Sequence, residues 1–115
     1  MIERTMDDRY TQRQLETFAQ VDDVVKHLSG MSITELGRKG RKRMFVLIRT
    51  FYCYYVRKAG MSLWDMADKC RFSSHGTAYF HAHRHEDRMK YDELYRVVHS
   101  CAVKYCNERN YNWIE

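Results

Sequence analysis

Four of the thirteen residues in the stretch SSHGTAYFHAHRH, residues 73 to 85, are histidines. Imidazole groups bind metals, transfer protons and form hydrogen bonds with nucleic acids, so three kinds of chemistry are open here. His81 and His85 are four residues apart and would share one helix face, as two zinc ligands can. No third ligand and no H-E-x-x-H glutamate accompany them. We expect no metal site, with zinc at His81 and His85 a weak alternative, and expect His81, His83 and His85 to lie on a polar, partly wet helix face.

The same stretch lacks the arrangement of an active site. Ser73, Ser74 and His75 are adjacent in the chain, whereas the members of a catalytic triad usually come from distant segments. The sequence also contains no glycine-rich phosphate-binding loop. We therefore expect no enzymatic activity, no catalytic residue and no cofactor.

The charge of the chain is concentrated in its middle third. Residues 1–35 contain 7 acidic and 4 basic residues, residues 36–64 contain 8 basic residues and no acidic one, and residues 65–115 contain 8 of each. The whole net charge of +5 therefore comes from the middle block. A local basic block beside a neutral remainder favours a polyanionic partner, although a solvated helix face would look the same.

The composition favours one helical domain, residues 1–115, because proline is absent and only five of the 115 residues are glycine. The four cysteines show no paired spacing and are expected to be reduced and mostly buried. The N-terminus has no apolar stretch of a signal peptide. The longest apolar run, residues 44–56, is too short to span a membrane. We expect a cytoplasmic protein.

Hydrophobic spacing and capping residues predict an all-α fold of five to six helices. A first part, residues 1–30, contains an amphipathic helix, residues 31–90 form the core of the domain, and residues 91–115 form a last helix and a tail. The expected helices are 8–28, a short one starting at the Ser32-Ile-Thr-Glu35 capping box, 41–59, one from Ser62 to about 71, one from residue 73 or 74 to about 89, and 92–106.

The pair of helices around residues 63–89 follows the plan of a helix-turn-helix, in which the second helix enters the DNA major groove. Its first turn holds five small or polar residues that could contact bases: Ser73, Ser74, His75, Gly76 and Thr77. Two alternatives stay open. The serines could simply cap the helix. Gly76 could be a turn residue or could let DNA approach the backbone closely, at a cost of about 1 kcal/mol relative to alanine.

Basic residues before and within the expected central helix could neutralise DNA phosphates without sequence preference. Those before the helix are Arg38, Lys39, Arg41, Lys42 and Arg43. Arg49 differs from them because it interrupts an apolar helix. It could point to a groove or phosphate, which we favour, or extend from the edge of the core to solvent.

The order of these pieces resembles the C-terminal DNA-binding domain (domain IV) of the bacterial replication initiator DnaA, a helix-turn-helix related to the Trp repressor. In that family a basic segment leads into a long helix, a Ser-Leu-x-Glu-Ile-Gly helix follows, and an Asp-His-Thr/Ser-Thr signature opens the recognition helix before a His-Ala pair. The matching parts, within residues 24 to 89, are RKGRKR (38–43), IRTFYCYYV (48–56), SLWDMA (62–67), SSHGT (73–77) and FHAHR (80–84).

By this resemblance, Arg49 corresponds to a groove-contacting arginine, and Ser74, His75 and Thr77 to base-contacting positions. The signature has Ser74 in place of its acid and Gly76 in place of its first threonine, and an alignment from FHAHR backwards shifts it by one residue. The family's DNA sequence is therefore not carried over. The resemblance implies a stand-alone module, of a phage or mobile element, that binds double-stranded DNA without ATPase activity in replication or transcription.

A different class of function also fits the sequence. The acidic, amphipathic first helix, or the tail with Tyr111, Trp113 and Ile114, could dimerise or bind another protein. The two functions are compatible, because many helix-turn-helix proteins act as dimers.

Overall fold

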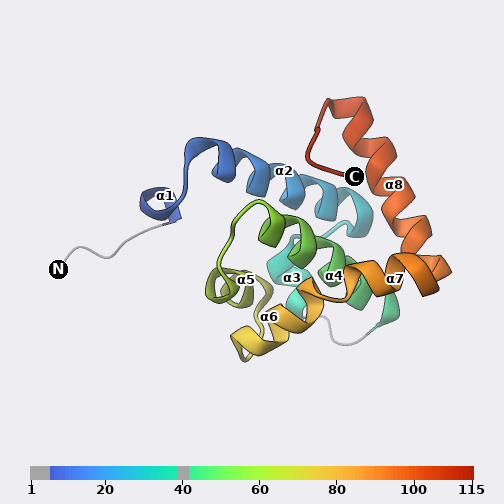
Figure 1. Ribbon diagram of the computed structural model, residues 1–115, viewed down its shortest axis with the longest axis horizontal. Helices are drawn as coiled ribbons and strands as arrows, with labels where there is room; N and C mark the ends of the chain where they lie inside the picture. Colours follow the sequence, from blue (N-terminus) through green and yellow to red (C-terminus); the bar gives the residue numbers. More distant parts are fainter. Residues whose placement is uncertain (1–5, 39–41) are drawn as a thin grey trace.

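A computed structural model describes residues 6–38 and 42–115, which form helices connected by turns (Figure 1). The described residues contain no β-strand. The helices are α1 (Met6–Arg9), α2 (Gln12–Ser29), α3 (Ile33–Arg38), α4 (Arg43–Lys58), α5 (Leu63–Cys70), α6 (His75–Ala82), α7 (His85–Tyr91) and α8 (Glu93–Arg109).

The all-α prediction is confirmed, and each expected helix is present. Two differences raise the number of helical segments in the described residues to eight. The single turn α1 precedes α2, which is capped at Thr11 by a box in which Thr11 accepts from the Gln14 N–H and Gln14 accepts from the Thr11 N–H. The helix expected from residue 73 or 74 to about 89 is divided into α6 and α7.

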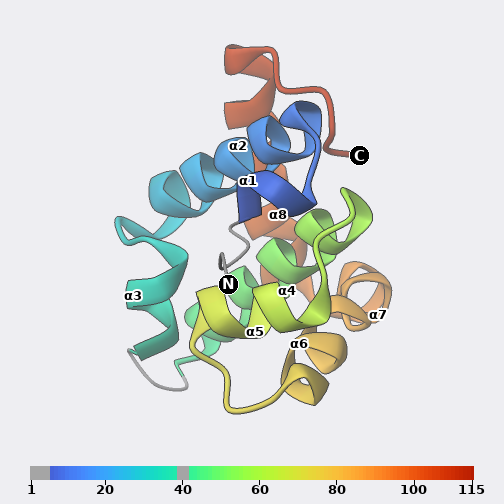
Figure 2. The same ribbon diagram turned by 90° about the vertical axis from the view of Figure 1, so that its left-hand side faces the viewer.

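The centre of the fold is α4, as its wide apolar face predicts. Nine consecutive or near-consecutive residues of α4, from Leu47 to Val56, are buried. The helix contacts α2, α3, α5, α6, α7 and α8. In Figures 1 and 2, α2 lies along one side of α4, and α5 and α6 lie along the other. The helix-turn-helix segment therefore rests on a buried support.

The division between α6 and α7 has no glycine or proline to explain it. The chain turns at His83 and Arg84, where the Arg84 N–H donates to the His81 carbonyl at 3.2 Å. His85 then becomes the first residue of α7, stacks on Tyr54 at 3.7 Å and shares a 2.7 Å hydrogen bond with the Tyr95 hydroxyl. Because α6 packs on α4 and α5 while α7 packs on α8, tertiary contacts divide the helix.

The end of α3 packs against the end of α5 with no space for a side chain. A Cβ added to Gly37 would lie 2.0 Å from the carbonyl oxygen of Cys70 and 3.4 Å from the Cβ of Arg71. The Thr34 hydroxyl also donates to the Lys69 carbonyl at 2.9 Å. Gly37 thus fixes where α5 ends and where the turn to α6 begins.

The C-terminal tail packs back onto the helices. Tyr111, Trp113 and Ile114 are half-buried against the core. The Trp113 indole N–H donates to the Gln20 side chain at 3.0 Å, and the Tyr111 hydroxyl donates to Asp23 at 2.8 Å. No helix among the described residues is long and apolar enough to cross a membrane.

Candidate nucleic-acid interface

Two short helices joined by a four-residue turn form the candidate interface. Ser62 caps α5 by accepting from the Asp65 N–H at 3.1 Å, and α5 ends at Arg71 with a left-handed φ of 60°. Ser74 caps α6 and accepts from the Thr77 N–H at 3.4 Å. The helices α5 and α6 pack against each other, and both pack against α4. These contacts fix the position of the turn between α5 and α6.

The five residues expected to contact bases lie together on the surface at the start of α6. Ser73, Ser74, His75 and Gly76 are exposed, and Thr77 is half-buried. Ser74 caps α6 and is also exposed, so its role as a cap leaves it accessible to a ligand. The His75 ring stacks on Trp64 at 4.4 Å, which joins the first turn of α6 to α5.

Gly76 is not a turn residue, because it lies within α6. The described glycines with positive φ are Gly30 and Gly60, so the backbone at Gly76 is open to other residues. A Cβ built there would have the Ser74 hydroxyl oxygen as its nearest neighbour in the described residues, at 3.6 Å. The fold therefore gives no reason for a glycine at position 76, and an external partner that approaches the backbone is the alternative that remains.

Replacing Gly76 with alanine should raise the free energy of unfolding by about 0.5–1 kcal/mol, because alanine loses less conformational entropy in a helix. Urea unfolding of the two proteins measures the difference. A ligand that contacts the α6 backbone should at the same time bind the alanine variant less tightly. A destabilised variant would show that Gly76 has a structural role.

Exposed aromatic residues, which the sequence analysis did not single out, surround this turn. Trp64 is 67% exposed, and Tyr79 and Phe80 are each 52% exposed. The Arg84 guanidinium lies 5.3 Å from the centre of the Phe80 ring, and Tyr79 stacks on His83 at 3.9 Å. Trp64 could have been found from the sequence, because it lies off the apolar stripe of Leu63, Met66, Ala67 and Cys70.

The residues expected to bind phosphates are only partly within the described chain. Lys39 and Arg41 lie outside the described residues, as does the side chain of Arg38. Lys42 is exposed immediately before α4. Arg43 is 61% exposed in its side chain and pairs with Asp92 at 2.6 Å, so its charge is partly neutralised. Of these residues, Lys42 is the best-placed surface cation that the structure describes.

Arg49 lies in the interior, although its expected role was at a groove or phosphate. The residue is 6% exposed, and its guanidinium donates to the Leu36 carbonyl at 2.6 Å. Burial lowers the pKa of Arg49. Arg49 also lines a hollow of about 520 Å³ with Arg71, Ser73, Thr77 and His81. In this structure its contact with Leu36 ties α3 to α4.

The expectation of a wet face for all three later histidines is wrong for two of them. His81 and His85 are buried, at 8% and 7% exposure, whereas His83 is exposed. Burial, together with Arg49 and Arg88, lowers the pKa of His81 to about 4. Burial, together with His99 and Lys58, lowers that of His85 to about 4. Within residues 6–38 and 42–115, no group of three or more His, Cys, Asp or Glu side chains could hold a metal ion.

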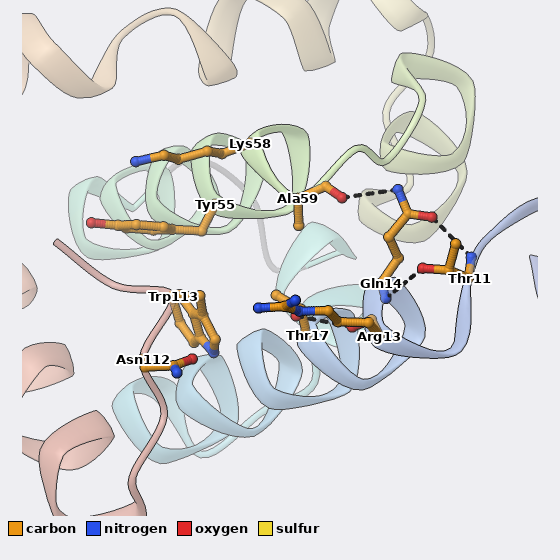
Figure 3. A pocket seen from close by; sticks show the side chains of 9 residues that line it. All are labelled: Thr11, Arg13, Gln14, Thr17, Tyr55, Lys58, Ala59, Asn112 and Trp113. Carbon is orange, nitrogen blue, oxygen red and sulfur yellow. Dashed lines mark hydrogen bonds between the residues drawn. The ribbon is translucent and has the colours of Figure 1, made fainter.

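A second hollow, of about 380 Å³, lies between the start of α2, the end of α4 and the C-terminal tail (Figure 3). Several of the groups that line it are bonded to one another. Gln14 donates to the Ala59 carbonyl at 3.2 Å, which joins the start of α2 to the end of α4. Lys58 pairs with Glu115 of the tail, so Gln14 and Lys58 already have structural roles.

The described residues form an all-α protein in which α5, a four-residue turn and α6 leave the start of α6 exposed. No family model, curated protein or solved structure matches the chain.

Proposed function

We propose that the protein binds double-stranded DNA through the α5–α6 helix-turn-helix, with the first turn of α6 in the major groove. Gly76 carries this proposal, because a glycine without a structural reason marks the point at which the α6 backbone approaches a ligand. The adjacent Ser73, Ser74, His75 and Thr77 supply hydrogen-bonding groups for base edges. The basic block before and within α4 supplies charge for phosphates.

The resemblance to the DNA-binding domain of DnaA supports the same surface, since its signature corresponds to residues 73–77. Replication or transcription is the process that this resemblance suggests. The departures at Ser74 and Gly76 lie within the proposed base-contacting turn, so the DNA sequence recognised by the family is not carried over to this protein.

A salt titration with mixed-sequence duplex DNA tests the proposal. The logarithm of Kd should rise linearly with the logarithm of the salt concentration, because phosphate contacts release counterions. Lys42→Ala should weaken binding to all sequences alike and reduce the slope by about 1. Lys104→Ala is the matched control, because Lys104 is also exposed but lies on α8, away from α5 and α6 in both views. Absence of any salt-dependent binding at low ionic strength would refute DNA binding.

Sequence discrimination is tested separately, with duplexes selected from a random pool. His75→Ala and Thr77→Ala should each reduce the preference for the selected duplex over a scrambled one by about tenfold, the lower range of one specific base contact. Equal loss of affinity for both duplexes would show that these two side chains contact the backbone of DNA and not its bases.

A protein-binding adaptor is the alternative proposal, and the structure gives it less free surface. The apolar face of α2, with Phe18, Val21, Val24 and Val25, is buried in the core. The tail packs on the same helices. Light scattering of the full chain would reveal dimerisation through other surfaces, such as the outer face of α8, where Val97 is 53% exposed.

A further inference from the structure

The side of α6 that points away from the core carries one very small and one large apolar residue. Ala78, His81 and Ala82 are the buried residues of α6. At 100° per residue, Gly76 and Phe80 lie on the opposite side, one turn apart. Phe80 is 52% exposed, and the added Cβ at Gly76 meets almost nothing. A ligand that reaches the backbone at Gly76 must therefore meet the ring of Phe80 about 6 Å further along the helix.

On this geometry, and resting on the proposed DNA binding, we propose that Phe80 is a specificity-determining residue that contacts the C5-methyl group of a thymine. The thymine methyl group is the apolar feature of the major groove, and a phenylalanine ring is one of the side chains that contact it.

The surroundings of Phe80 favour DNA over an apolar protein surface. The Arg84 guanidinium lies over one side of the ring, at 5.3 Å from its centre, and the His81 ring meets it edge-on at 5.6 Å. The cation beside the ring could pair with the phosphates that line a DNA groove. In an apolar protein interface the same cation would have to lose its hydrating water, which is unfavourable. The ring edge remains for a methyl group to contact.

Replacing thymine by deoxyuridine, one position at a time in the tightest duplex selected from a random pool, removes only the methyl group. For the wild-type chain we expect one position at which the substitution weakens binding about fourfold, the effect of one buried methyl. For Phe80→Ala the difference between thymine and deoxyuridine at that position should vanish. Phe80→Leu, which keeps an apolar contact, should retain part of it.

Tyr79→Ala is the matched control, because Tyr79 has the same exposure but stacks on His83 and lines a different hollow with Tyr54 and Arg57. It should keep the full thymine preference. Tight binding without any deoxyuridine effect, or an unchanged effect in Phe80→Ala, would overturn the methyl contact and leave DNA binding intact. Failure of the wild-type chain to bind any duplex would instead overturn the proposed function itself. Phe80 would then be tested as a contact residue for a protein partner.

Discussion

Replacing Gly37 with alanine should lower the free energy of unfolding by about 1–2 kcal/mol. The new methyl group would lie 2.0 Å from the carbonyl oxygen of Cys70, a backbone atom that cannot rotate away. Overpacking of this kind costs about 1–3 kcal/mol, occasionally more, and exceeds the gain of about 1 kcal/mol that alanine brings to a helix. Urea or thermal unfolding measures the loss.

Gly76→Ala is the matched control for this experiment, because it makes the same chemical change in another short helix where space is open. The two substitutions should have opposite signs. Gly37→Ala should also displace the turn that follows Cys70, and thereby weaken DNA binding through loss of geometry. Equal stabilisation by both alanines would contradict the close approach of α3 to α5.

Acidification from pH 7 to pH 5 should destabilise the protein by a few kcal/mol in total, through its buried histidines. His81 and His85 have pKa values lowered to about 4, and burial also lowers the pKa of His99. The unfolded chain, with histidine pKa values near about 6.5, binds these protons first. Stability is therefore fully present above about pH 6.5 and is lost as the pH falls toward 4. His81 and His85 should each contribute about 1 kcal/mol by pH 5 after solvent screening, and His99 should act in the same direction.

Burial of the rings determines the sign of the effect, and the charged groups around them reinforce it. Lys58 and His99 add positive charge near His85, and Arg49 and Arg88 add it near His81, so a further proton is unfavourable at either ring. The carboxyl groups of Asp65 and Asp92 have lowered pKa values, so their effect on stability belongs to more acidic solutions. Burial raises the pKa of Asp22, and this one carboxyl group opposes the effect of the three buried histidines as the pH falls.

His85→Phe separates the contribution of one histidine from the rest. This variant keeps an aromatic ring against Tyr54 but loses the hydrogen bond to the Tyr95 hydroxyl, so its stability at pH 7 should be lower. Its loss of stability between pH 7 and pH 5 should nevertheless be smaller than that of the wild type. His83→Phe, at the exposed position, is the control and should retain the wild-type pH dependence. An identical pH dependence in His85→Phe would contradict the assignment.

Much of the helical framework could be predicted from the sequence, because local signals specify it. Ser62, Ser74 and Asp92 each accept a hydrogen bond from an N–H three residues later, at the start of a helix. The spacing of Phe18, Val21 and Val25 marked the buried face of α2. The continuous apolar character of α4 marked it as the central helix, and the charge of residues 36–64 marked the basic block. These signals depend on neighbours within one or two turns.

The tertiary structure decided the features that depend on distant residues. Arg49 interrupts an apolar run, and its sequence position is compatible with a side chain in solvent or in the interior. In the folded protein the carbonyl of Leu36 gives its guanidinium a buried partner. Likewise His81 and His85 carry no local sign of burial. Packing of α7 against α8 places His85 between Tyr54 and Tyr95 and divides a helix that nothing in the local sequence interrupts.

The two glycines show the same division most clearly. Gly37 lies in α3 and Gly76 in α6, and the local sequence does not distinguish the two glycines. Only the tertiary structure places the backbone of Cys70 against Gly37 and leaves open space beside Gly76. The sequence alone therefore determined most of the helices, their order and their charge. The packing of those helices decided which side chains are buried and which remain on the surface, because burial is set by contacts between segments far apart in the chain.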